Sequence, residues 1–178
     1  MTDPAPPHGR FARWGEHPAG PALLFGSAVL EGCLFPAPTE ALFAALALAR
    51  PRRSALLAAV ATAGSVTGGV LGYLAGAALW DPVARPVLAW WGLEGGVSVV
   101  AAAYRRHLPL ALLTSGYTPI PYLLYAYAGG SLGVPFLPFV LWSLAGRGIK
   151  FALLATATRW LGPPLRRLVS RIAARFRR

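Results

Sequence analysis

The feature that most constrains this chain is a set of four apolar runs, two continuous and two broken by a Pro-x-Pro pair. A helix that crosses a bilayer needs about 20 consecutive apolar residues. Residues 54–80 and 135–160 meet that length, whereas each arm of the runs 20–49 and 108–134 is too short to cross. Hydrophobic residues make up 56% of the chain and charged residues 13%, which is outside the range of soluble proteins. The sequence therefore predicts an all-α integral membrane protein.

Two proline pairs divide the interrupted runs. They are Pro36 with Pro38 and Pro119 with Pro121. Proline removes an amide donor and turns the preceding residue away from helix, so each pair marks a turn. Irregular backbone survives at membrane depth only where protein or a watery cavity shields it. We therefore expect re-entrant helical hairpins at 20–49 and 108–134, each followed by a transmembrane helix.

The two halves of the chain repeat the same order of features. The Pro-x-Pro pairs are offset by 83 residues, and Gly64 and Gly146 follow their pairs about 26 residues later. Two hairpins of this kind, each leading into a span, predict an inverted repeat in which the hairpins approach the membrane midplane from opposite faces.

The distribution of arginine supports this topology. With both termini inside, twelve arginines lie on the inner side and three on the outer side, as the positive-inside rule requires. The inner ones are Arg10, Arg13, Arg50, Arg52, Arg53, Arg159 and the six between residues 166 and 178; the outer ones are Arg85, Arg105 and Arg106. The sequence therefore predicts a multi-pass membrane protein with both termini on the cytoplasmic side.

Three segments flank the apolar runs of the membrane domain 20–161. Residues 1–19 form a polar N-terminal tail. Residues 81–107 read as an interfacial segment with Trp90 and Trp91 at headgroup depth; if it crossed instead, the termini would face opposite sides. Residues 162–178 predict a basic amphipathic helix that binds anionic lipid headgroups rather than nucleic acid.

Glycines recur every four residues in the first span. They are Gly64, Gly68, Gly72 and Gly76. This spacing lays a shallow groove along one helix face, where another helix or hairpin can pack closely. Ser65, Thr67 and Tyr73 beside the groove serve either packing or a polar path.

Four ionisable residues fall inside apolar runs. Glu31 and Glu40 flank the first proline pair, and Arg147 and Lys150 share one side of the second span. Arg147 lies about 18 Å from the start of that span, near the bilayer middle. Ionisable groups at this depth cost about 2.5 to 3.5 kcal/mol each and usually pair or line a functional cavity. Either they clamp hairpin to span, or they form a polar cavity in which the bases receive an anion and a glutamate exchanges protons.

Other chemistry has little support in the sequence. There is no metal-ligand spacing, phosphate loop or nucleophile motif, so we expect neither an enzyme nor a metal or other cofactor. The single Cys33 fits a small buried hydrophobe. The histidines, at 8, 17 and 107, lie in or beside polar segments.

The stretches "FPAPTE", "GSVTGGVLGYLAG", "GYTPIPY" and "GRGIKF" resemble the DedA superfamily, also called the VTT-domain or SNARE-associated Golgi protein-like group, in its small YqaA-type members. The resemblance covers about residues 25–152. It implies two opposed re-entrant hairpins and transbilayer movement of phospholipid or polyprenyl phosphate. It also implies that Glu31 and Glu40 are the membrane-embedded acids and Arg147 the arginine of the late glycine-arginine-glycine motif. Lys150 stands where arginine is usual, and Leu123 where a basic residue is frequent.

Together with this resemblance, these features predict a lipid transporter or scramblase of the bacterial inner membrane whose substrate headgroup crosses along Glu31, Glu40, Arg147 and Lys150. The partner would be a phospholipid or another anionic amphiphile, and a homo-oligomer is compatible with the sequence. Two alternatives stay open, a proton- or cation-coupled transporter of small solutes and a membrane scaffold that transports nothing.

Overall fold

The computed structural model describes residues 19–35, 38–118 and 120–175, with side chains to residue 160. Within these ranges the regular structure is entirely helical, as predicted. The α-helices are α2 (Gly20–Cys33), α3 (Thr39–Ala49), α4 (Ser54–Ala78), α5 (Arg85–Trp90), α6 (Gly96–Thr114), α7 (Tyr122–Ser131) and α8 (Phe136–Arg175). A short 3-10 helix, η1 (Pro51–Arg53), precedes α4, and a π-helical segment, η2 (Trp80–Ala84), follows it.

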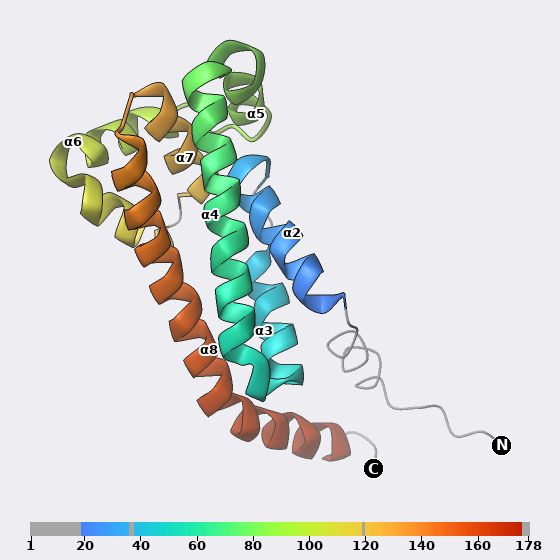
Figure 1. Ribbon diagram of the computed structural model, residues 1–178. Helices are drawn as coiled ribbons and strands as arrows, with labels where there is room; N and C mark the ends of the chain where they lie inside the picture. Colours follow the sequence, from blue (N-terminus) through green and yellow to red (C-terminus); the bar gives the residue numbers. More distant parts are fainter. Residues whose placement is uncertain (1–18, 36–37, 119, 176–178) are drawn as a thin grey trace.

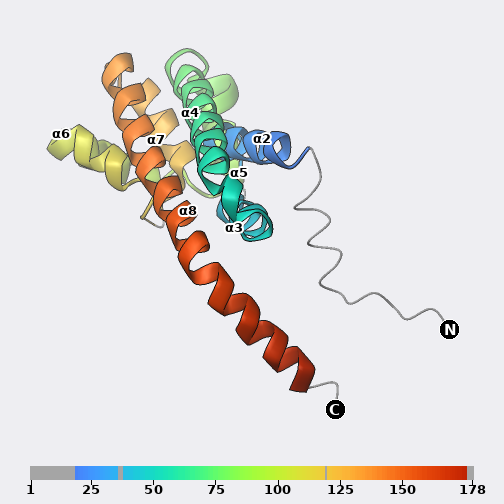
Figure 2. The same cartoon turned by 60° about the horizontal axis from the view of Figure 1, so that its bottom comes forward.

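Two long antiparallel helices, α4 and α8, form the frame of the molecule (Figure 1). Ala58 near the start of α4 shares an apolar cluster with Ala155 midway along α8. Tyr73 near the end of α4 packs on Phe139 near the start of α8, with ring centroids 5.0 Å apart. Figure 2 shows α8 running beside α4 and beyond it. The stretches Pro51–Ala78 and Phe136–Trp160 are long and apolar enough to cross a membrane.

Two helical hairpins lie against this frame and open toward its opposite ends (Figure 1). One consists of α2 and α3, and it leads through η1 into the start of α4. The other consists of the last turns of α6 and α7, and it leads into the start of α8. The hairpins touch, because the Tyr127 hydroxyl in α7 donates a hydrogen bond to the carbonyl oxygen of Cys33 at the end of α2.

The second proline of each pair lies directly before the second arm of its hairpin. Pro38 is the N-cap residue of α3, and Pro121 is the N-cap residue of α7. Proline suits this position because the first amide groups of a helix have no intrahelical acceptor. Pro36 and Pro119 lie outside the described residues.

The glycine face of α4 brings the hairpins into backbone contact. A Cβ atom on Gly64 would lie 2.6 Å from the carbonyl oxygen of Phe25 in α2, and one on Gly68 only 2.2 Å from that of Val29. Farther along the face, a Cβ on Gly72 would lie 2.8 Å from the Gly32 oxygen, and one on Gly76 would lie 2.2 Å from the Tyr127 oxygen of α7. The first hairpin therefore covers the early glycines and the second hairpin covers the last one.

Helix α7 is the most enclosed element. Every residue from Tyr122 to Gly130 is buried. The helix ends at Ser131, and Gly133, just beyond the C-cap residue Leu132, has a φ of 65° in the left-handed region. The amide of Val134 then bonds the Gly129 carbonyl at 3.0 Å, and the amide of Gly133 bonds the Gly130 carbonyl at 3.1 Å. This is a Schellman motif, and it turns the chain sharply into α8.

Two predicted boundaries differ from the structure. Residues 81–107 are not one segment, because η2 and α5 are followed by α6, which continues to Thr114. The predicted boundary coincides with a kink at His107 (φ −158°, ψ 91°), where Pro109 interrupts helical hydrogen bonding. Helix α8 does not end at residue 160 but continues to Arg175, so it runs through Gly162, Pro163 and Pro164 into the predicted tail helix. The predicted amphipathic side chains of that tail, and the N-terminal tail up to residue 18, lie outside the described part.

Candidate functional site

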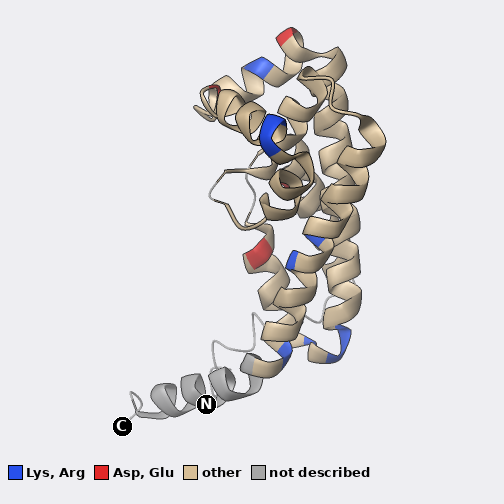
Figure 3. Ribbon diagram, turned by 90° about the vertical axis from the view of Figure 1, so that its left-hand side faces the viewer, with Lys and Arg blue, Asp and Glu red and all other residues tan. Residues whose placement is uncertain are grey.

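The molecule contains a polar layer between two apolar clusters. One cluster surrounds α7 and includes Phe139 of α8, whereas the other lies at the α3–α4 end and includes Phe43 and Phe151. On α8 the polar residues Ser143 and Arg147 fall between the two phenylalanines. Figure 3 shows the charged positions at the two ends of the molecule and in one group between them.

Arg147 is the centre of this layer and is 1% exposed. Its Nε donates a hydrogen bond to Ser65 Oγ of α4 at 2.7 Å, and its Nη2 donates to Glu31 Oε1 of α2 at 2.8 Å. The guanidinium also lies 4.2 Å from the ring centroid of Tyr122 in α7, within the range of a cation–π contact. A single side chain on α8 thus holds the first hairpin, the frame helix and the second hairpin together.

Arg147 reaches this position because glycine precedes it. A Cβ atom on Gly146 would lie 2.7 Å from the Leu112 carbonyl oxygen in α6. This contact parallels the one that Gly64 makes with α2, and the two glycines are those of the repeated sequence pattern. In both halves the long helix therefore meets the first arm of the preceding hairpin through a glycine.

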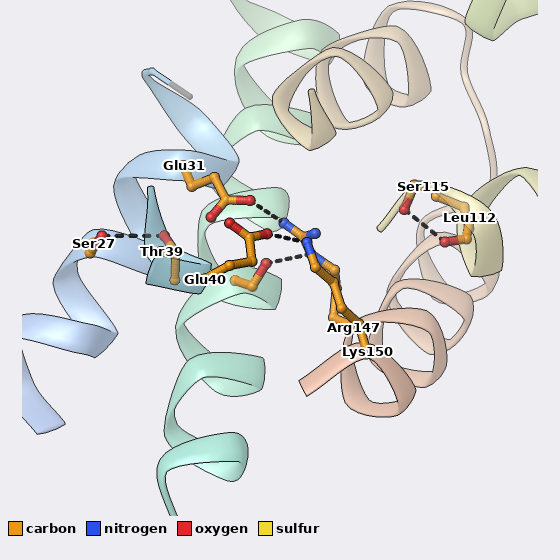
Figure 4. A network of polar contacts seen from close by, with 9 residues as sticks. Ser27, Glu31, Thr39, Glu40, Leu112, Ser115, Arg147 and Lys150 are labelled. Carbon is orange, nitrogen blue, oxygen red and sulfur yellow. Dashed lines mark hydrogen bonds and ion pairs between the residues drawn. The ribbon is translucent and has the colours of Figure 1, made fainter. Parts of the chain in front are cut away.

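A second ion pair lies one turn farther along α8. Lys150 Nζ donates to Glu40 Oε1 in the first turn of α3 (Figure 4). The side chain of Lys150 is 11% exposed and that of Glu40 is 39% exposed, whereas the side chains of the Arg147 and Glu31 pair are 1% and 11% exposed. The layer therefore contains one sealed pair and one pair whose carboxylate reaches the surface.

The layer contains buried polar atoms that make no hydrogen bond within it. Three buried atoms have no hydrogen-bond partner among the described residues: Glu31 Oε2, Tyr122 Oη and Ser143 Oγ. Ser143 lies one helical turn before Arg147 on α8, and Tyr122 Oη lies over Gly69, one turn after Ser65 on α4. Nearly all buried polar groups in proteins are paired, so such a cluster calls for an explanation.

The structure brings all four predicted charged residues together, although they come from three helices. Glu31 pairs with Arg147 and Glu40 with Lys150. Ser65, predicted to serve either packing or a polar path, accepts a hydrogen bond from Arg147. Thr67 instead bonds the Ala63 carbonyl of its own helix, and the Tyr73 hydroxyl bonds the Val134 carbonyl. The described residues contain no group of three His, Cys, Asp or Glu that could hold a metal ion.

Sequence reasoning did not single out Thr39, Tyr122 or Ser143. Thr39 is fully buried, and its hydroxyl lies 3.2 Å from that of Ser27, where it links α3 to α2. Thr39 and Tyr122 each directly follow the second proline of a pair, 83 residues apart. The polar residue at both repeat-related positions was the sequence signal that could have identified Thr39 and Tyr122.

Comparisons with known proteins find bacterial relatives and name no activity. No family profile and no solved structure matches the chain. An uncharacterised protein of Haemophilus influenzae is 25% identical over 149 residues, which are 84% of this chain and 77% of that protein. An uncharacterised protein of Histophilus somni is 23% identical over 150 residues, 84% of this chain and 78% of that protein. The chain is thus similar, over most of its length, to bacterial proteins whose descriptions assign no function.

Proposed function

We propose that this protein moves the anionic headgroup of a membrane lipid across a bacterial inner membrane through its central polar layer. The observation that carries the proposal is the pairing of two acids from the short helices α2 and α3 with two bases midway along the membrane-length stretch of α8. Charges at that depth are costly and mark substrate or ion paths. One of the two pairs is still accessible from the surface, so it can exchange its partner.

The surface of the helices supports an orientation across the bilayer. Only 28% of the apolar stretch of α8 is buried within the chain, which a core helix of a soluble protein would not tolerate. Large exposed side chains follow the two long helices: Leu56, Leu71, Leu74, Leu137, Leu141, Leu144, Ile149 and Leu153. Lipid chains would cover this surface without cost.

The opposed hairpins support a re-entrant arrangement. Neither α2, with 14 residues, nor α3, with 11 residues, is long enough to cross, and both run into the polar layer. We therefore infer an inverted repeat of hairpin and span, as in the DedA superfamily that the sequence resembles. The connecting helices α5 and the start of α6 would lie at the interface.

The pair of Glu40 and Lys150 provides a mechanism by which a lipid phosphate can enter the polar layer. A proton that binds the Glu40 carboxylate removes its charge and releases the Lys150 ammonium. The lipid phosphate then takes the place of the carboxylate beside Lys150, and loss of the proton restores the original pair. Glu31, Ser65 and Tyr122 hold Arg147 during this exchange.

A lipid-scrambling assay in proteoliposomes tests the proposal, with fluorescent phosphatidylglycerol and dithionite quenching. We expect Lys150→Gln to lower the rate about ten- to a hundredfold, which corresponds to the loss of a charged hydrogen bond of about 1.5–3 kcal/mol. Lys150→Arg should keep most of the rate. Glu40→Gln should leave a rate that no longer depends on pH, since the exchangeable proton is gone.

Arg106→Gln serves as the control, because Arg106 is exposed and lies outside the polar layer. A folded wild-type protein that scrambles no lipid would refute the proposal. So would a Lys150→Gln variant that scrambles like the control.

A further inference from the structure

A groove lies between the first turns of α4 and the middle of α8. It is at the end of the frame opposite the one toward which the second hairpin opens. It has a volume of 770 Å³, within the usual range of about 300–1,000 Å³ for small-molecule sites. Its lining residues are Ser54, Ala55, Ala58, Ala152, Ala155 and Thr156, with Arg159 and Trp160 at its end. The groove is therefore lined mainly by small, apolar side chains, and one end carries the cationic Arg159 and the aromatic Trp160.

The charges around the groove favour an anion. Arg159 is exposed, and so are Arg52 and Arg53 in η1, which contacts α8. The acidic side chains within the described ranges lie elsewhere: Glu31 and Glu40 pair with the central bases, and Asp81 and Glu94 lie near the far end of α4. Figure 3 shows this excess of basic positions where α3 joins α4.

The shape of the groove favours a lipid over a soluble anion. Alanine at positions 55, 58, 152 and 155 leaves a channel between two helices that one acyl chain can fill. Trp160 is 76% exposed beside it, and tryptophan prefers the headgroup level of a bilayer. Basic pockets between membrane helices on the cytoplasmic side bind anionic headgroups.

We propose that this groove binds one anionic glycerophospholipid of the inner leaflet, with an acyl chain between α4 and α8 and the phosphate on Arg159. The site is separate from the central polar layer. It rests on the proposed insertion in the membrane, and it would place a lipid within reach of the layer from the inner side.

Native mass spectrometry of the full chain, released from nanodiscs of equal phosphatidylglycerol and phosphatidylcholine, tests the site. We expect retained phosphatidylglycerol on the wild type and about fivefold less on Arg159→Gln, the effect of one basic residue near an anionic surface. Ala152→Trp should abolish retention, because Ala152 is exposed in the groove and a larger side chain fills it.

Two matched controls keep the test specific. Leu153→Trp adds bulk to the neighbouring exposed position of α8 outside the groove, and Arg106→Gln removes an exposed arginine that does not line the groove. Both should retain lipid like the wild type. Equal retention by Arg159→Gln or Ala152→Trp would overturn the site, as would a dimer that covers the groove and retains no lipid.

The same variants separate this site from the proposed transport. Lys150→Gln should retain phosphatidylglycerol at the groove even though its scrambling is lost. Normal retention in a protein that scrambles nothing would leave the groove valid and refute transport. Scrambling without retention of phosphatidylglycerol would support the proposed transport and refute the groove as a lipid site.

Discussion

At the scale of single residues, the two ion pairs differ in what they can do. Arg147 is buried on every side, and its charge is balanced by Glu31 and its donors are used by Ser65 and the same carboxylate. Removing one partner of a buried pair leaves an uncompensated charge, which costs far more than the pair itself contributes. In the second pair the Lys150 side chain is 11% exposed, but the Glu40 carboxylate is 39% exposed and can lose its partner without being left fully buried. We therefore assign the first pair to the stability of the fold and the second to exchange.

Arg147→Gln should destabilise the protein by about 3–5 kcal/mol, because Glu31 is then buried without its cation. The double variant Glu31→Gln with Arg147→Gln should recover part of this loss. Lys150→Gln should cost less stability than Arg147→Gln, because the Glu40 carboxylate that it leaves unpaired is 39% exposed. Thermal unfolding in detergent, followed by tryptophan fluorescence, measures all three. An Arg147→Gln protein as stable as Lys150→Gln would contradict the assignment.

At the scale of elements, the fold depends on how closely the hairpins approach α4. The carbonyl oxygens of Phe25 and Val29 in α2 lie directly over Gly64 and Gly68, and α7 lies in the same way over Gly76. These contacts set the depth of Glu31 relative to Arg147, because Glu31 lies within the α2 segment, from Phe25 to Gly32, that crosses the glycines. A small displacement of α2 would therefore separate the sealed ion pair.

Gly68→Ala should destabilise the protein by about 1–3 kcal/mol, because its Cβ would lie 2.2 Å from a backbone oxygen and α2 must move away. Gly26→Ala, in α2 itself, is the matched control. Its Cβ meets nothing within 4 Å, and alanine is the better helix former, so stability should stay equal or rise. Melting temperatures of the two variants in detergent test this prediction. Equal losses of stability in both variants would show that α2 does not pack tightly on Gly68.

At the scale of the whole molecule, the antiparallel arrangement of α4 and α8 makes the two hairpins open toward opposite ends. Hairpin α2–α3 opens at the end where Arg52 and Arg53 lie, and the second hairpin opens at the end where α8 begins. If α4 and α8 cross the bilayer, each hairpin is accessible from a different compartment. The polar layer between the two apolar clusters would then be the place where both routes meet.

Labelling with a membrane-impermeant maleimide tests this orientation in a Cys33→Ser background. Arg53→Cys should react only in inside-out vesicles, and Arg106→Cys only in intact spheroplasts, because η1 lies where α4 begins and α6 lies in the half of the molecule where α8 begins (Figure 1). Labelling of both positions from one side would rule out the inverted arrangement.

The sequence by itself determined that the chain is helical, which stretches are long enough to span, and where the proline pairs break the shorter runs. Those properties follow from local composition and from the loss of an amide at proline, so no tertiary contact is needed to predict them. It also indicated Glu31, Glu40, Arg147 and Lys150, because charge in an apolar run is conspicuous. Only the tertiary structure decided which acid meets which base, that Tyr122 and Ser65 complete the sealed pair, and that one carboxylate stays accessible. These depend on how α2 and α7 cross the glycine face of α4, and side chains 116 and 82 residues apart meet only when helices pack.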